Sequence, residues 1–96
     1  MTMDNAEALA LLDQELARLR DQPYAQLVAR IGGEPQVVEP TGAGGTRYQV
    51  EIEVIWDDRP DGNVRVLGSI DDGGWRAFKP LTRDFVKAPD GAFEGE

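Results

Sequence analysis

The chain has 96 residues, 41% of them hydrophobic and 29% charged, which indicates one globular domain of the smallest common size class. Cysteine and histidine are both absent, and this excludes disulfides, thiolate nucleophiles, histidine bases and most transition-metal sites. With 10 basic against 18 acidic residues, the net charge of −8 disfavours nucleic acids and anionic membranes as partners. We therefore expect no cofactor, no metal, no nucleic acid and no membrane.

The first residues lack the pattern of a targeting signal. No basic residue occurs among the first five, and the longest apolar run covers only residues 8–12. A secretory signal needs a cationic start and a longer apolar stretch, and a membrane-spanning helix needs about 20 apolar residues. Together with the lack of cysteine, this predicts a cytoplasmic protein of bacterial type.

An amphipathic helix is predicted close to the N-terminus. Asp4 and Glu7 have the spacing of a capping box, in which each side chain accepts a hydrogen bond from an unpaired backbone N–H. Leucines then recur three or four positions apart, which places them on one face of a helix: Leu9, Leu12, Leu16 and Leu19. Pro23 ends this helix, because its ring removes a donor and clashes with the preceding turn.

Pro23 also suits the first position of a second helix. Apolar side chains with helical spacing follow it, up to a pair of glycines at 32 and 33: Tyr24, Leu27, Val28 and Ile31. The two helices are therefore predicted to cover about residues 4–31 and to meet at a proline corner.

From residue 34 onward the apolar positions alternate, which is typical of strands with one buried face. Two long strands are predicted over residues 48–56 and 64–70, and a shorter one near 36–39. Arg-Pro-Asp-Gly at 59–62 has the composition of a bulged hairpin turn, with Gly62 at the position of positive φ.

A last hairpin is predicted before the C-terminal segment. Asp72 and Gly73 fit a two-residue turn that leads into a strand over residues 74–79. Pro80 is expected to stop further pairing, because proline cannot donate a hydrogen bond within a sheet.

Beyond Pro80 the sequence predicts little regular structure. Thr82 is expected to cap a single helical turn through Phe85 and Val86. Residues 89–96 are small or polar and are expected to fray.

These elements predict one α+β domain over residues 1–96. Two N-terminal helices are expected to pack on one face of an antiparallel β-meander of three or four strands, which covers about residues 36–79. A short turn and a tail take up residues 80–96, with no linker or second domain.

Two motifs that resemble ligand loops fail on spacing. Gly-Ala-Gly-Gly at 42–45 lacks the third glycine of a dinucleotide loop, since Arg47 stands there, and no Gly-Lys-Ser/Thr follows. A calcium loop that began at Asp57 would have Arg59 at its third position and Gly68 at its twelfth, where a carboxylate is required. A plain hairpin loop and solvated turn carboxylates are the better interpretations.

Few side chains remain for catalysis. Ser69 is the only serine and has no histidine to activate it, while Lys79 and Lys87 have no recognisable partner. A pair of carboxylates would have to come from Glu51, Glu53, Asp57 and Asp71. On a shallow surface such groups are weak proton donors near neutral pH, so the chain is predicted not to be an enzyme.

A pattern in the C-terminal half resembles known proteins. Ile-Asp-Asp-Gly-Gly-Trp at 70–75 is followed by Pro-Leu-Thr-Arg-Asp-Phe at 80–85 and by Pro-Asp-Gly at 89–91. Over about residues 64–91 the chain thus resembles small uncharacterised bacterial proteins that are classed as a domain of unknown function. The pattern consists of turn and packing residues, so the resemblance implies no catalytic or binding residue.

Three functions stay open, led by a non-catalytic protein-interaction module that binds another protein or forms a homodimer. The alternative is an immunity-type inhibitor of a basic toxin, because a net charge of −8 speeds encounter with a cationic partner. That alternative is an analogy of size and charge with known immunity proteins. An enzyme that uses surface carboxylates comes third, and an acidic surface kept for solubility explains the charge equally well.

The predicted turns also fix which strand residues face each other. They pair Val54 with Gly68, Ile55 with Leu67, Leu67 with Phe78, and Ile70 with Trp75. The face toward the helices then holds Val54, Trp56, Val66, Ile70 and Trp75.

The opposite face is predicted to carry an apolar row that could bind a partner. Ile55, Leu67 and Phe78 form this row, bordered by Glu53, Ser69, Arg65 and Arg76. Either Phe85, Val86 and Phe93 fold back to cover the row, or it is an interface with a second copy or another protein.

Overall fold

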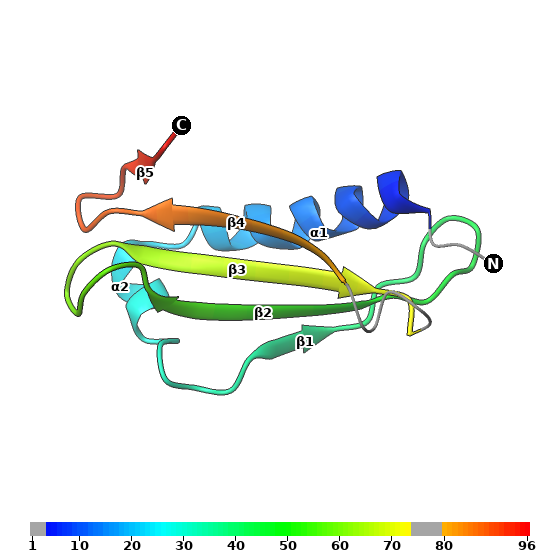
Figure 1. Cartoon of the computed structure of the whole chain (residues 1–96), viewed down its shortest axis with the longest axis horizontal. Helices are drawn as coiled ribbons and strands as arrows, with labels where there is room; N and C mark the ends of the chain where they lie inside the picture. The colour runs from blue at the N-terminus through cyan, green and yellow to red at the C-terminus, as the bar shows by residue number, and fades with distance from the viewer. Residues whose placement is uncertain (1–3, 74–79) are drawn as a thin grey trace.

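The computed structural model describes residues 4–73 and 80–96. These residues form two helices and one antiparallel sheet, whose five strands pair in chain order (Figure 1). The elements are α1 (Asn5–Arg20), α2 (Tyr24–Val28), β1 (Gln36–Val38), β2 (Gln49–Trp56), β3 (Val64–Asp71), β4 (Leu81–Lys87) and β5 (Phe93–Glu94). The predicted α+β class with an antiparallel sheet is confirmed, whereas the predicted number of three or four strands is wrong.

The helix α1 covers the predicted residues. Asp4 caps its first turn, since Oδ1 of the side chain accepts a hydrogen bond of 3.1 Å from the N–H of Glu7. The carboxylate of Glu7 instead accepts bonds from Ala43 and Tyr48, so only half of the predicted capping box forms. Leu12, Leu16 and Leu19 of the predicted stripe are buried together with Ala8, whereas Leu9 is only half-buried and lies outside the core.

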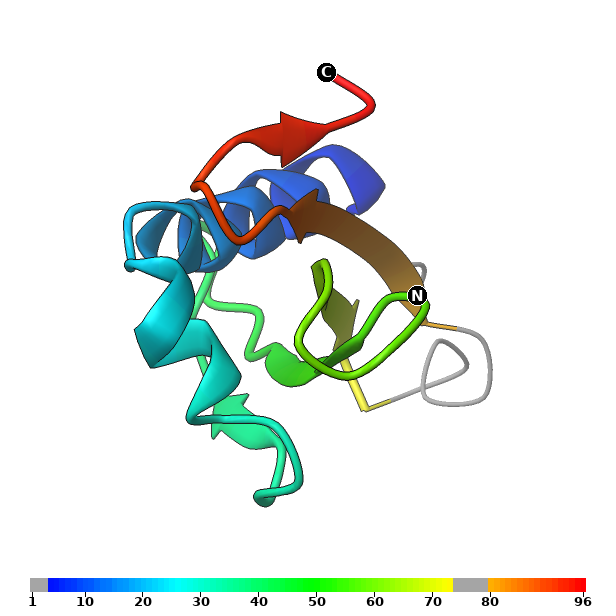
Figure 2. The same ribbon diagram turned by 90° about the vertical axis from the view of Figure 1, so that its left-hand side faces the viewer.

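The second helix is shorter than predicted. It ends at Val28, with Ala29 as its C-cap, and the N–H groups of Arg30 and Ile31 then bond only three residues back along the chain. Both helices lie on the same face of the sheet, where α1 contacts β3 and β4 while α2 contacts β2 and β3 (Figure 2). Neither of these two helices, in the described part of the chain, has the length and apolar character to cross a membrane.

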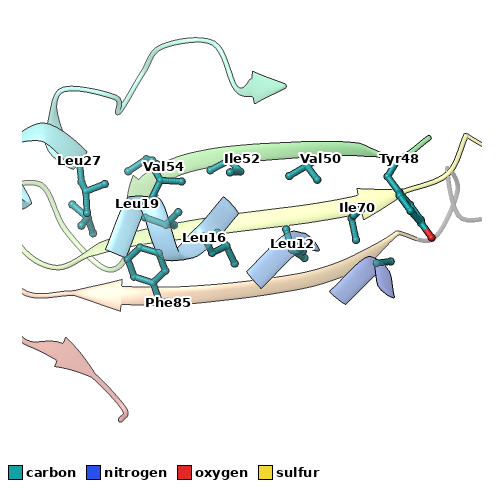
Figure 3. Close-up of a cluster of buried hydrophobic side chains, with 13 residues drawn as sticks. Leu12, Leu16, Leu19, Leu27, Tyr48, Val50, Ile52, Val54, Ile70 and Phe85 are labelled. Atoms are coloured by element: carbon teal, nitrogen blue, oxygen red, sulfur yellow. The ribbon is translucent and has the colours of Figure 1, made fainter. Parts of the chain in front are cut away.

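The hydrophobic core fills the space between the helices and the sheet (Figure 3). Alternate residues of the two central strands point into it: Val50, Ile52, Val54, Val64, Val66 and Ile70, all at most 6% exposed. The predicted inner face is confirmed for Val54, Val66 and Ile70, and Trp56 packs against the core while remaining half-buried. Trp75 lies outside the described residues.

Gly68 lets α1 approach the centre of the sheet. A Cβ at this position would lie 2.8 Å from Cδ1 of Leu12 and 3.2 Å from Cδ2 of Leu16. Protein interiors leave no room for such an overlap unless these leucine side chains or the helix shift. The glycine therefore allows the close packing of Leu12 and Leu16 on β3.

The β2–β3 hairpin has the predicted faces but a different register. Val54 pairs with Val66 and Ile55 with Arg65, where the sequence predicts Gly68 and Leu67. The turn is longer than predicted, because the N–H of Asp57 donates to the Asn63 carbonyl at 2.8 Å. Asp61 rather than Gly62 takes the positive φ, at 66°. Since the shift is two residues, every side chain keeps its predicted face.

The predicted partner of β3 is wrong. Ile70 pairs with Leu81 and Leu67 pairs with Asp84, in place of Trp75 and Phe78. The strand β4 therefore takes the residues predicted as a helical turn, since Thr, Phe and Val favour extended structure. Pro80 stands just before β4, where its missing N–H removes no bond from the sheet. The predicted strand over residues 74–79 lies outside the described residues.

The C-terminal tail is ordered, contrary to the prediction that it frays. The N–H of Ala88 donates to the carbonyl of Ala92 at 2.8 Å, and Gly91 takes a φ of 91° in the turn between them. This turn returns β5 to β4, and Phe93 packs edge-on against Phe85 with 5.8 Å between ring centroids. The tail thus extends the sheet by one short strand.

Two cations hold the end of α1 against β4 and the tail. Nζ of Lys87 donates to the carbonyls of Arg20 and Gln22 at 3.0 and 2.8 Å, which satisfies two acceptors at the helix C-terminus. Arg20 lies 4.0 Å from the ring centroid of Phe93 and donates two hydrogen bonds to Glu96. The bonds between them raise the pKa of Arg20 and lower that of Glu96.

Both outermost strands of the sheet are short. β1 pairs three residues with β2 and lies between Pro35 and Pro40, and β5 pairs two residues with β4. Val37 of β1 is 52% exposed. The long, regular pairing is confined to β2, β3 and β4.

Replacing Gly68 with Ala is expected to lower the free energy of unfolding by about 1–3 kcal/mol, because the added methyl group collides with Leu12 and Leu16. Urea denaturation measures the change. Gly44→Ala is the matched control, since nothing lies within 4 Å of its added Cβ. Equal midpoints for the two variants would contradict the close approach of α1.

Lys87→Met is expected to cost about 1–3 kcal/mol of stability, because it keeps the aliphatic stem but leaves the carbonyls of Arg20 and Gln22, at and just beyond the end of α1, without their donor. Arg18→Met removes the same charge from the last turn of α1 at an exposed side chain and should cost less than about 0.5 kcal/mol. Thermal melting of both variants checks the prediction. A loss no larger for Lys87→Met than for Arg18→Met would show that the cap is unimportant.

Candidate functional site

The glycine-rich loop binds a carboxylate of the protein itself. Residues 42–45 form the predicted loop, closed by the N–H of Gly42 bonded to the Thr46 carbonyl at 2.8 Å. Oε2 of Glu7 accepts from the N–H of Ala43 at 3.1 Å, and a Cβ at Gly42 would overlap the same carboxylate. The place that an anion would take is therefore filled by α1.

Tyr48 completes this contact from the start of β2. Its hydroxyl donates to Oε1 of Glu7 at 2.7 Å, and its side chain is 2% exposed. Burial, and then the hydrogen bond to Glu7, raise the pKa of Tyr48 to about 12. The pair joins α1 to the sheet, and Tyr48 also borders a pocket of about 160 Å³.

Because the pKa of Tyr48 is raised on folding, its contribution to stability is complete below pH 10 and is lost as the pH rises toward 12. The free energy of unfolding of the native chain should fall over this range. Tyr48→Phe should show a smaller fall, because its ring cannot ionise. Ultraviolet titration of tyrosinate checks the pKa directly, and ionisation of both tyrosines near pH 10 would contradict it.

The other candidates for catalysis are separated or already bonded. The amine of Lys87 is bound by helix carbonyls, and Asp57 is bound by Arg65. Glu51 and Glu53 are exposed on one strand. Across residues 4–73 and 80–96, no three acidic side chains gather in a way that could hold a metal ion. This part of the chain offers no assembled set of acid, base and nucleophile.

The face of the sheet away from the helices is the remaining candidate, and we call it the outer face (Figure 2). Strand alternation places on it Val37, Gln49, Glu51, Glu53, Ile55, Arg65, Leu67, Ser69, Asp71, Thr82, Asp84, Val86 and Glu94. Neither helix lies on this face. Of the three residues predicted to cover this face, Phe85 and Phe93 lie on the helix side with Arg20. Val86 does lie on the outer face, opposite Arg65, and is buried.

The apolar row predicted on this face is interrupted by charges. Leu67 lies between Glu53 and Asp84, and Ile55 lies opposite Arg65. Ile55, Leu67 and Arg65 do share the outer face, as predicted, and all three are half-buried. Phe78 and Arg76 lie outside the described residues.

A hollow of about 240 Å³ lies at the centre of the outer face. Leu67 and the backbone of Gly68 contribute to its apolar lining, and its polar lining comes from Glu51, Glu53, Ser69 and Thr82. The sequence prediction included Leu67, Glu53 and Ser69 but missed Thr82, since it read this residue as a helix cap. Alternation of Thr82, Asp84 and Val86 along one face of a strand is the signal that could have located it.

Arg65 forms ion pairs on the same face as the hollow. Its Nε donates to Oδ1 of Asp57 at 2.8 Å, Nη2 lies 2.7 Å from the same oxygen, and the guanidinium also pairs with Asp84. These bonds, that to Asp57 first, raise the pKa of Arg65. The one guanidinium on the described part of this face is therefore already neutralised.

Negative charge dominates the described strands of the outer face. Five carboxylates stand against the guanidinium of Arg65: Glu51, Glu53, Asp71, Asp84 and Glu94. Glu51 and Glu53, which line the hollow, form no ion pair with residues 4–73 or 80–96. Within the described part of the chain, these two unpaired charges thus lie beside the apolar lining.

No protein-family model matches the chain, and no curated protein or solved structure matches it significantly. The function therefore has to be argued from the chemistry of these residues. The outer face is the surface that combines a hollow, an apolar centre and unpaired charges. It is the candidate functional site.

Proposed function

We propose that this chain is a cytoplasmic, non-catalytic protein-interaction module that binds another protein through its outer face. The observation that carries the proposal is the hollow beside Leu67 on the face opposite to both helices. Apolar side chains at the centre of a face, surrounded by polar ones, are the usual anatomy of a protein interface.

The arrangement of the core supports this use of the outer face. The helices cover the inner face so fully that Val50, Val64, Val66 and Ile70 are completely buried. Leu67 adds little to that core, because it points to the other side of β3. A half-buried leucine among carboxylates is not needed for solubility, which the carboxylates alone would provide.

The lack of assembled catalytic groups in the described residues supports a binding function over an enzymatic one. An inhibitor of a basic toxin, of the immunity type, is the second candidate. The described strands of the outer face carry five carboxylates against one guanidinium. This negative charge favours the inhibitor, since it speeds encounter with a cationic protein. In both cases the same surface makes the contact.

Leu67→Ser is expected to weaken partner binding about tenfold or more, because a central apolar contact is worth more than about 1.4 kcal/mol. Proteins captured from a lysate of the source cells on the immobilised chain would be identified by mass spectrometry and then purified. Calorimetry with each purified partner gives the dissociation constants of the native chain and the variant.

Leu9→Ser is the matched control, because Leu9 is a half-buried leucine on α1, away from the outer face. It should leave the dissociation constant within about twofold of that of the native chain, a change under ~0.5 kcal/mol. Urea denaturation confirms that both variants fold. Equal affinity of the Leu67→Ser variant and the native chain for every purified partner would contradict the proposal, as would failure to capture any protein.

A further inference from the structure

We infer that the hollow beside Leu67 receives a lysine or arginine side chain of the partner protein. The inference rests on the proposed function, because it names the chemistry of the partner at the outer face. It also decides between the two partners that the sequence leaves open, a second copy of this chain and a different, cationic protein.

The lining of the hollow matches the two parts of a basic side chain. Leu67 and the backbone of Gly68 provide apolar surface, against which a chain of methylene groups can pack. Glu51 and Glu53 alternate on the same strand face, about 7 Å apart, and both line the hollow. A cationic head at the mouth can therefore approach both carboxylates while its stem remains on Leu67.

The hydroxyl side chains complete the match. Ser69 of β3 and Thr82 of β4 lie opposite each other in the sheet, and both line the hollow. A hydroxyl oxygen can accept a hydrogen bond from an ammonium or a guanidinium. A basic side chain bound in the hollow would therefore have hydroxyl acceptors as well as carboxylates within the lining.

The pairing of charges on the outer face locates the attraction at the hollow. Asp57 and Asp84 share Arg65, which offsets one of their two charges. Glu51 and Glu53 have no such partner among the described residues. A basic side chain at the hollow would pair with them, as Arg65 pairs with the two aspartates.

A second copy of this chain does not fit the same surface. A two-fold contact through the outer face would bring this surface against its own copy. The excess of carboxylates would then meet an equal excess, and Glu51 and Glu53 would be buried near like charges. A purely apolar partner is also disfavoured, because it would remove water from these two carboxylates without pairing them.

Short peptides test the inference without a purified partner. We would titrate the isotope-labelled chain with three end-capped peptides of alternating threonine and one variable residue: lysine, norleucine or glutamate. The lysine peptide should shift the amide resonances of Leu67, Ser69 and Thr82 and bind about tenfold more tightly than the norleucine peptide. The glutamate peptide should not shift them.

A double variant tests the two carboxylates. Glu51→Gln with Glu53→Gln should weaken the lysine peptide about tenfold or more. Asp13→Asn with Glu34→Gln is the control, because it removes the same charge from positions off the outer face, and it should change the affinity less than about threefold. Equal binding of the lysine and norleucine peptides, or equal effects of the two double variants, would overturn the inference.

The failure of this inference can be told apart from failure of the proposed function. If a purified partner loses affinity with Leu67→Ser but not with the Glu51→Gln, Glu53→Gln variant, the proposed interface stands and the basic side chain is wrong. Sedimentation at low and high salt gives a further result. A dimer of the native chain that Leu67→Ser dissociates would show that a second copy occupies the hollow, and it would also overturn the inference.

Discussion

The contact of Leu12 and Leu16 with the backbone of β3 at Gly68 is the constraint on which the rest of the structure depends. A helix this close to the sheet seals the inner face, so the valines and isoleucines of β2 and β3 that point inward lose nearly all contact with water. A chain of 96 residues has material for one such core. Because the core is complete on one side, the outer face is free to carry side chains selected for something other than folding.

The two ends of α1 are fixed by polar contacts of opposite sign. At the N-terminal end the carboxylate of Glu7 takes donors from Ala43 and Tyr48, and at the C-terminal end the ammonium of Lys87 supplies donors to two carbonyls. Apolar packing alone would allow a helix to slide or rotate on a sheet, whereas directed hydrogen bonds specify one position. These hydrogen bonds thus fix α1 in one position on the inner face of the sheet, opposite to the outer face.

Local patterns in the sequence predicted α1 and the faces of β2 and β3, because leucine spacing and strict alternation depend only on neighbours along the chain. The register was not predictable in the same way, since it depends on how many residues the turn at 58–62 takes. Pro-Asp-Gly occurs twice, and both copies are hairpin turns. The second copy was not predicted as a hairpin turn, because a hairpin needs a strand on each side and a helical turn was expected before it. The outer face was therefore predicted only in part. Leu67 and Arg65 belong to β3, which the alternation predicts, whereas Thr82 and Asp84 belong to β4, where a helical turn was expected.

The short edge strands described above have a consequence for how the molecule behaves in a crowded solution. An unpaired strand edge is a template on which a second chain can add, and this is a route to fibrous aggregates. Here β1 offers three residues between two prolines, so a strand added to β1 would gain few bonds and would soon meet residues that cannot donate. Val37 can therefore stay exposed on β1 without seeding such growth. At this edge, association is left to the side chains of a face, where charge and shape can discriminate between partners.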